Sequence, residues 1–175
     1  MKISKTIIKG CYVIESIKFE DKRGLNKFIN FYENKVLKNF KIDQIYQSIN
    51  VKNMFKGFHY QKRYPQVKLI SVTDGEIVDF IIDLRRNSNS YKKIISINLK
   101  GNDSKYIYIP KGCAHGFYTK KKSKILYLIQ GKFYSKYQTG INIHDDIFKK
   151  INKFINKQTN ISEKDIKLPA LEEKE

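Results

Sequence analysis

Short apolar runs with a period of two, separated by turn residues, constrain the fold of this chain more than any other feature. Such alternation is typical of β-strands, whose successive side chains point to opposite faces. The runs lie at 11–14, 68–72, 77–84, 93–99, 106–109, 116–118 and 125–129. Short strands at close intervals indicate a sandwich or barrel. Strand and helix patterns do not alternate along the chain, so a doubly wound sheet is disfavoured.

Two local signals refine this prediction. Asp74-Gly75 lies between two of the runs, and an Asp-Gly pair in that setting predicts a β-hairpin. One short helix is expected at 33–38. A second is expected at 145–156, behind an Asp145 cap, because apolar residues recur there at helical spacing; these are Ile147, Phe148, Ile151, Phe154 and Ile155.

Length and composition fit an ordinary globular protein. The 175 residues, 41% of them hydrophobic, suffice for one domain over 1–175 with its own core, and the charged end at 169–175 is expected to fray. No apolar run reaches about 18 residues, so no membrane span is expected. The first ten residues do not resemble a signal peptide. Cys11 and Cys113 stand alone, which favours reduced thiols and a cytoplasmic protein.

The net charge of +18 raises the question of nucleic-acid binding. Lysine supplies most of this charge and is scattered along the chain, whereas arginine occurs only at positions 23, 63, 85 and 86. Bidentate recognition of phosphates and bases favours arginine. A nucleic-acid partner is therefore disfavoured, while a positive field would still attract a small anionic substrate.

Two of the three histidines are candidates for chemistry. His59 and His115 each have a glycine within two residues, aromatic residues nearby and a predicted strand close by. His144, beside two aspartates, resembles a surface or capping residue. Either histidine alone would be interpreted as a buried structural residue, but two in similar settings indicate a shared pocket. Gln61 lies two residues after His59, so the H-x-H pair of metal-binding barrels is absent and no metal is expected. With a metal site disfavoured, the remaining candidate chemistry is acid–base catalysis by His, Tyr, Lys and Asp side chains.

Six short segments stand out along the chain: DKRG at 21–24, KGFHYQ at 56–61, QVKL at 66–69, IPKGCAHGF at 109–117, LY at 126–127 and SEKD at 162–165. In order, they resemble D-x-R-G, R-G-L-H-Y-Q, Q-G-K-L, P-x-G-x-A-H-G-F, L-Y and S-E-K-D, which are motifs of the dTDP-4-dehydrorhamnose 3,5-epimerase family. The resemblance extends from near the start of the chain to its end. Each is weak alone, but together and in order they are specific. The resemblance implies a cupin-like jelly-roll β-barrel with a few short helices, one of them toward the C-terminus. It also implies no cofactor, and a homodimer that exchanges N-terminal strands.

The resemblance implies a role for four residues. His59 would be the base that removes a proton next to the ketone of a 4-keto-6-deoxy sugar, and Asp165 would orient its ring. Lys68 would stabilise the enolate and Tyr127 would return a proton from the other face. The implied function is epimerisation at C3 and C5 of a nucleotide-linked sugar, in deoxysugar and polysaccharide biosynthesis.

Substrate-binding roles are implied, again by resemblance, for Arg23, Gln44, Asn50, Lys56, His115, Phe133 and Lys164. The chain departs from the family at several of the surrounding positions. Lys56 replaces an arginine, Phe28 replaces a glutamate and Phe133 replaces a tyrosine, and the segments at 130–132 and 145–161 also differ. These departures leave open which base is bound and whether one carbon or both are epimerised.

Two alternatives remain beside the double epimerase. One is a single-carbon epimerase on a related nucleotide sugar. The other is a catalytically silent barrel that binds sugars or nucleic acid, although a binding module would need no set such as His59, Lys68, Tyr127 and Asp165. A ketoisomerase is disfavoured by Gln61, since a second histidine would be expected there.

Overall fold

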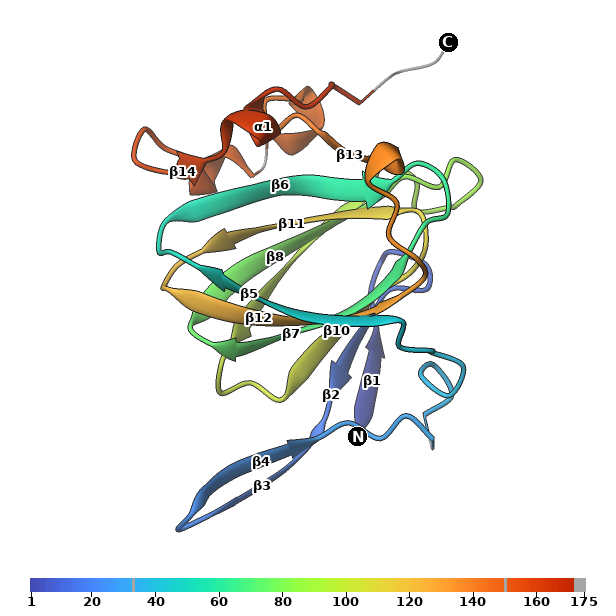
Figure 1. The fold of residues 1–175 in the computed structure, drawn as a ribbon, viewed down its shortest axis with the longest axis vertical. Helices are drawn as coiled ribbons and strands as arrows, with labels where there is room; N and C mark the ends of the chain where they lie inside the picture. Colours follow the sequence, from blue (N-terminus) through green and yellow to red (C-terminus); the bar gives the residue numbers. More distant parts are fainter. Residues whose placement is uncertain (33, 150, 172–175) are drawn as a thin grey trace.

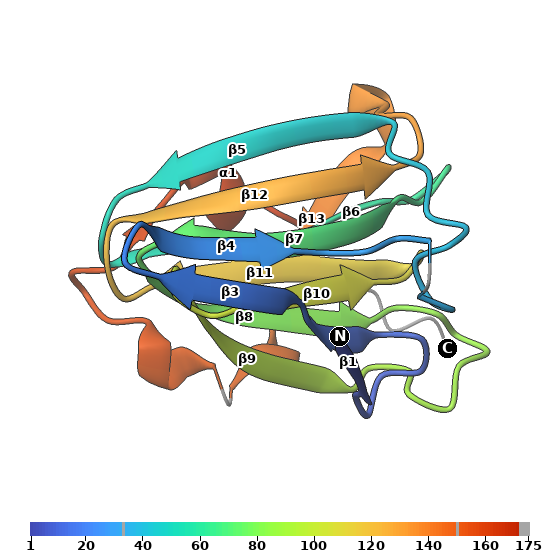
Figure 2. The ribbon, with the colours of Figure 1, turned by 90° about the horizontal axis from the view of Figure 1, so that it is seen from below.

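Two antiparallel β-sheets face each other in the computed structural model, which describes residues 1–32, 34–149 and 151–171 (Figures 1 and 2). The first sheet has the order β1 (Lys2–Lys5), β2 (Tyr12–Glu15), β10 (Lys105–Ile109), β7 (Val67–Asp74), β12 (Ser123–Gln130) and β5 (Gln44–Asn50). The second has the order β13 (Gln138–Ile141), β6 (Met54–Gln61), β11 (Cys113–Thr119), β8 (Glu76–Asp83) and β9 (Ile94–Lys100). The predicted mainly β barrel is confirmed.

The hairpin of β3 (Ile17–Asp21) and β4 (Gly24–Phe28) forms a sheet of its own. It projects from the body of the barrel, at the opposite end from the C-terminal segment (Figure 1). Every residue of β3 is exposed. The side-chain ammonium of Lys27 donates hydrogen bonds to the carbonyl oxygens of Gly101 and Asp103, which fixes the base of the hairpin against the loop before β10.

Strand β8 is buried on both faces, since seven of its eight residues are buried. Ile77 and Ile81 face the core between the two sheets. Val78, Phe80 and Ile82 belong to a second cluster, in which the segment after β13 covers the outer face of the sheet. A strand covered on both faces reads as a continuous apolar run and not as an alternation.

The C-terminal segment contains short elements only: η2 (Asp146–Phe148), η3 (Asn152–Phe154), β14 (Asn160–Ile161) parallel to β6, and α1 (Glu163–Ile166). The continuous helix expected at 145–156 was therefore wrong, although Asp145 does cap, accepting a hydrogen bond from the Ile147 amide at 3.0 Å. Isoleucine and asparagine are mediocre helix formers, and burial of the apolar residues against the sheet decides the local structure. The Phe148 ring stacks on Phe58 at a centroid distance of 4.0 Å.

Three further expectations need correction. The chain does turn sharply at Asp74-Gly75, where Gly75 has a φ of +84°. However, β7 pairs with β10 and β12, whereas β8 pairs with β11 and β9. The turn therefore connects the two sheets, and the predicted hairpin was wrong. An Asp-Gly signal predicts a reversal but not which strands then pair. Residues 34–38 form hydrogen-bonded turns and not a helix; residue 33 lies outside the described chain.

The expected fraying of 169–175 was wrong for its first residues. The Leu171 amide donates to the Asp145 carboxylate at 2.7 Å, and the Pro169 carbonyl accepts from the Asn142 amide at 2.8 Å. Residues 172–175 lie outside the described part of the chain. Within the described part, no helix is long and apolar enough to cross a membrane.

Candidate active site

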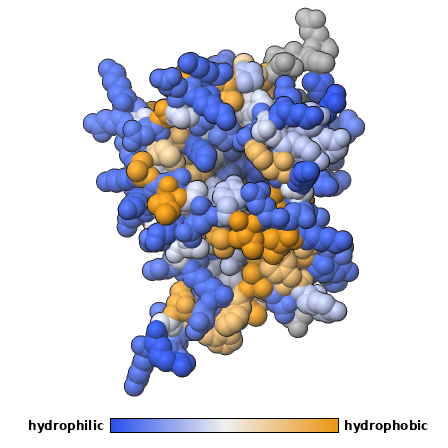
Figure 3. Space-filling view, viewed as in Figure 1, coloured by the Kyte–Doolittle hydropathy of each residue, from blue (hydrophilic) through white to orange (hydrophobic). Residues whose placement is uncertain are grey.

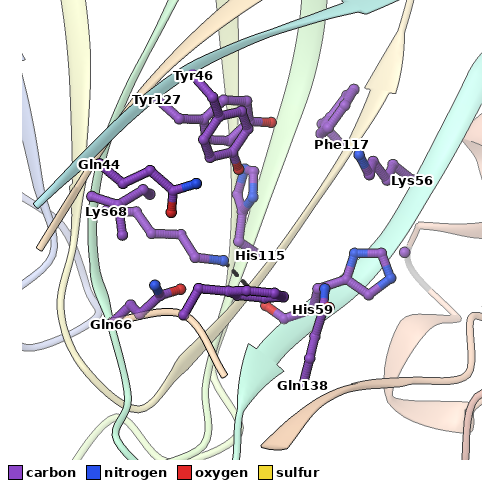
Figure 4. Close-up of a pocket in the computed structure, with 13 residues that line it drawn as sticks. Gln44, Tyr46, Lys56, His59, Gln66, Lys68, His115, Phe117, Tyr127 and Gln138 are labelled. Carbon is purple, nitrogen blue, oxygen red and sulfur yellow. Dashed lines mark hydrogen bonds between the residues drawn. The ribbon is translucent and has the colours of Figure 1, made fainter. Parts of the chain in front are cut away.

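A pocket of about 280 Å³ opens between the two sheets, lined by β6 and β11 on one side and by β5, β7 and β12 on the other (Figure 4). Its side chains are mostly polar or aromatic: Gln44, Tyr46, Lys56, His59, Gln66, Lys68, His115, Phe117, Tyr127, Ile129, Phe133 and Gln138. A concave pocket with a few convergent polar groups is the expected form of a small-molecule site.

His59 and Asp165 form the first of two histidine–carboxylate pairs. His59 lies on β6 and its Nε2 is 2.8 Å from Asp165 Oδ1 on α1. The other carboxylate oxygen of Asp165 accepts a hydrogen bond from the Gly57 amide at 3.0 Å. Burial opposes ionisation, yet the hydrogen bonds from His59 and Gly57 bring the pKa of Asp165 below its ordinary value. An ionised carboxylate only accepts, so Nε2 of His59 is the donor in this pair, and in the neutral imidazole Nδ1 then has the lone pair.

His115 forms the second pair, directly across the sheet from His59, since the two histidines are register partners on β11 and β6. Its Nε2 lies 2.6 Å from Asp79 Oδ1 on the neighbouring strand β8, and both side chains are buried. Burial raises the pKa of Asp79, an effect that His115 opposes. The pair fixes the imidazole of His115 at the floor of the pocket (Figure 4).

Lys68 and Tyr127 enter from the other sheet, on β7 and β12. The Lys68 ammonium group points into the pocket and donates to the His59 carbonyl oxygen at 3.4 Å (Figure 4). Burial, opposed by the charge of Asp79, lowers the pKa of Lys68 to about 8. Tyr127 is 4% exposed, and burial raises its pKa well above the ordinary value, so its phenol stays protonated.

The residues predicted for binding fall into three groups. Gln44, Lys56 and Phe133 line the pocket beside His115. Asn50 and Lys164 lie instead in an adjoining pocket that shares Lys56 and His59. Arg23 lies at the turn of the β3–β4 hairpin, with its side chain 88% exposed and paired to Asp21, outside the pocket of its own chain.

Sequence reasoning missed Asp79, Tyr46 and Gln138. Asp79 is a single charge inside the apolar run of β8, and a carboxylate in such a run needs a partner, which was a usable signal. Tyr46 lies on β5, a strand that the apolar pattern did not reveal because all but two of its residues are exposed. Gln138 follows η1 (Ser135–Tyr137) and shows no pattern of its own.

The described residues contain no group of three or more His, Cys, Asp or Glu side chains placed to hold a metal ion. Cys11 and Cys113 are both free and buried, and burial raises the pKa of each thiol to about 12. These thiols are therefore packing residues of the core and poor nucleophiles.

Comparison with known proteins gives one consistent family. The family model described as dTDP-4-dehydrorhamnose 3,5-epimerase matches residues 5–173. The dTDP-4-dehydrorhamnose 3,5-epimerase of Methanothermobacter thermautotrophicus is 34% identical over 143 residues, covering 78% of this chain and 76% of that protein.

Two solved structures extend the similarity to the fold. The dTDP-6-deoxy-D-glucose-3,5-epimerase of Legionella pneumophila, in complex with dTDP-4-keto-L-rhamnose, has a TM-score of 0.86 at 26% identity, over 97% of this chain and 92% of that chain. The dTDP-4-dehydrorhamnose 3,5-epimerase of Bacillus anthracis, with TDP and PPi bound, has a TM-score of 0.83 at 28% identity, over 97% of this chain and 99% of that chain.

The fold and the similarities define an isomerase built on a cupin-like β-barrel. The chain belongs to the dTDP-4-dehydrorhamnose 3,5-epimerase family.

Proposed function

We propose that this protein epimerises C3 and C5 of a nucleotide-linked 4-keto-6-deoxy sugar, of the dTDP-4-dehydro-6-deoxyglucose type. The observation that carries the proposal is that His59 and Tyr127 line one pocket from opposite sheets, with Lys68 on β7, the strand that pairs with the strand of Tyr127. A base and an acid on two sides of one ring are the minimum equipment for inverting a carbon.

In the proposed first step, Nδ1 of His59 takes the proton from the carbon next to the ketone. Asp165 holds the imidazole by Nε2 and stabilises the positive charge that the ring acquires. The electron pair of the broken C–H bond moves into the carbonyl and forms an enolate, so the substrate's own ketone serves as the electron sink.

Negative charge on the enolate oxygen requires a nearby cation. Lys68 supplies one, and its low pKa of about 8 comes from the desolvation that also strengthens its attraction to an anion. His115, held by Asp79, is a further polar group that lines the same pocket.

In the second step Tyr127 would donate its phenolic proton to the opposite face of the enolate carbon. Burial keeps the phenol protonated until that moment. His59 then releases its proton to solvent and Tyr127 takes one up, which restores both groups for the same step at the second acidic carbon. General acid–base groups of this kind contribute about 10²–10⁴-fold each.

The nucleotide would lie toward the mouth, where Lys56 offers a positive charge to the pyrophosphate and Phe133, 48% exposed, offers a stacking face to the base. The dTDP-4-keto-L-rhamnose and TDP bound in two relatives support a nucleotide-sugar ligand. Asn50 and Lys164 would assist from the adjoining pocket.

A homodimer is part of this proposal, with residues 1–175 of each copy acting as one epimerase domain. The β3–β4 hairpin presents Phe19 at 63% and Phe28 at 51% exposure, and hydrophobic surface continues beside the hairpin in Figure 3. A second copy that covered this surface would carry Arg23 toward a pocket other than its own. Deoxysugar and polysaccharide biosynthesis in the cytoplasm is the setting that the family membership favours.

The test is incubation of the purified protein with dTDP-4-dehydro-6-deoxyglucose in deuterated water, read by NMR. Deuterium at both C3 and C5 at comparable rates is the expected result. Deuterium at one carbon only would make this a single-carbon epimerase, a possibility that the departures at 130–132 favour. No exchange with any 4-keto nucleotide sugar would leave a binding protein.

A further inference from the structure

Gln61 follows His59 on the same face of β6, and its side-chain amide makes three hydrogen bonds to loop backbone. It is 6% exposed. Its Nε2 donates to the carbonyl oxygens of Tyr64 at 2.8 Å and Lys132 at 3.2 Å. Its Oε1 accepts from the Tyr134 amide at 2.6 Å. A buried amide with donors and acceptor all engaged holds its partners in one arrangement.

Two of these bonds flank Phe133. The Lys132 carbonyl belongs to the peptide group before Phe133, and the Tyr134 amide belongs to the peptide group after it. Rotation of these two peptide planes about the Phe133 Cα is what φ and ψ describe. Bonds from one buried side chain to both planes therefore fix the backbone of Phe133 and the direction in which its Cα–Cβ bond leaves the chain.

The rest of the loop is anchored by other groups. The Gly131 amide donates to Asp43 at 2.6 Å, and the Gly131 carbonyl accepts from Gln66 at 2.9 Å. These contacts secure the start of the loop but do not touch the peptide planes of Phe133. The Phe133 ring itself is half-exposed at the mouth of the pocket, so packing alone does not hold it.

We infer that Gln61 is a positioning residue for ligand recognition. Its side-chain amide orients Phe133 toward the nucleobase by hydrogen bonding to the peptide groups on both sides of that residue. This inference rests on the proposed function, because it takes the ligand to be a nucleoside diphosphate sugar. It also explains why β6 carries an amide two residues after the base, since the same strand then sets both the proton-transfer group and the stacking platform.

The test uses Gln61→Met, which keeps the volume of the side chain and removes all three hydrogen bonds, with Gln61→Glu as a second variant that keeps only the acceptor. Binding of dTDP and of inorganic pyrophosphate is measured by calorimetry. Both variants should weaken dTDP by about tenfold, the scale of one lost base–aromatic stack, and leave pyrophosphate within twofold. In a Phe133→Ala background the Gln61 substitution should add less than twofold.

The matched control is Asn53→Gly, which removes a bridging amide just before the opposite end of β6. Asn53 donates to the Gln158 carbonyl at 2.8 Å, and its φ of 58° suits glycine, so the loss is confined to the side chain. This variant should leave both affinities within twofold.

Hydrogen exchange separates failure of this inference from failure of the proposed function. The Tyr134 amide should exchange slowly in the wild type and at least tenfold faster in Gln61→Met, whether or not a nucleotide binds. Equal weakening of pyrophosphate and dTDP, an undiminished effect in the Phe133→Ala background, or unchanged Tyr134 exchange would each overturn the role of Gln61. Absence of dTDP binding by the wild type, with the exchange result intact, would refute the assigned ligand and restrict Gln61 to loop positioning.

Discussion

The rings of Tyr46 and Tyr127 stack face to face in the pocket, with centroids 4.4 Å apart and planes inclined by 9°. They are cross-strand partners on β5 and β12. Burial raises the pKa of Tyr46 to about 12, and burial together with the neighbouring Tyr46 raises the pKa of Tyr127 well above its ordinary value. The pair therefore keeps the proposed acid protonated and fixes the plane of its ring.

The stack predicts a difference between two substitutions at Tyr46. Tyr46→Phe keeps the ring and should leave the turnover number within about threefold, whereas Tyr46→Ala frees the Tyr127 ring and should lower it by about 10–100-fold, since misplacement by about 1 Å can cost on the order of 10²-fold. Steady-state kinetics with a reductase-coupled assay measures both. Gln47→Ala, one residue along and exposed, is the control. Equal losses in Phe and Ala would mean that the Tyr46 hydroxyl acts in the chemistry.

The His59–Asp165 pair predicts graded losses. His59→Ala should lower deuterium exchange at C3 and C5 by about 10²–10⁴-fold with the fold intact. Asp165→Ala should cost less, because the base remains and only its orientation suffers. Asp146→Ala removes an aspartate whose side chain is 84% exposed and serves as the control. If His59→Ala kept more than a few per cent of the exchange rate, the base would have to lie elsewhere.

The low pKa of Lys68 predicts an alkaline limit to activity. As pH rises through about 8, Lys68 loses the charge that would stabilise the enolate, so the turnover number should fall. Lys68→Arg should be slower at every pH but should lack this fall, because a guanidinium does not titrate there. The pH profile of the turnover number distinguishes the two. A fall of the same shape in Lys68→Arg would assign it to another group.

The same group predicts the sign of a stability effect. Lys68 has a lower pKa in the folded protein than its ordinary value of 10.5, so between about 8 and 10.5 the unfolded chain binds more protons at this residue. Its contribution to the free energy of unfolding should therefore increase with pH across that window. Denaturation at several pH values, compared between wild type and Lys68→Met, measures the difference.

The outer cluster predicts a large stability loss on truncation of Phe148. Its ring lies parallel to that of Phe58, inclined by 4°, and is fully buried. Phe148→Ala should lower the free energy of unfolding by about 3–5 kcal/mol. Tyr32→Ala, at a side chain 93% exposed, should change it by less than about 0.5 kcal/mol. Equilibrium urea denaturation compares the two, and a small loss for Phe148→Ala would show that the segment rests loosely on the sheet.

The sequence predicted the strands well where turn residues bounded an apolar run, as at β8 and β10, because local chemistry determines both. Prediction from sequence failed where strand pairing or tertiary packing determines the structure. Asp74-Gly75 fixes a reversal, but the partners of β7 and β8 come from strands distant in the chain. The segment at 145–156 has a helical apolar pattern, yet contact with Phe58 and Phe80 overrides it.

The site shows the same division. Motifs indicated His59, Lys68, Tyr127 and Asp165, and three of these line one pocket while Asp165 bonds to His59. No local signal joins residues 59 and 165, which meet only because β14 pairs with β6 and turns α1 toward it. Tyr46 and Gln61 gain their roles from side-chain geometry, which a single sequence does not display.

The attachment of α1 has a consequence for how this protein would lose activity. Asp165 is delivered by a four-residue helix and a two-residue strand, whereas His59 belongs to the long central ladder of the second sheet. Short peripheral elements open at lower free energy than the strands beneath them. Mild urea should thus lower the activity by releasing the carboxylate while the barrel is still folded, so that part of the activity is lost before the β-sheet signal in circular dichroism.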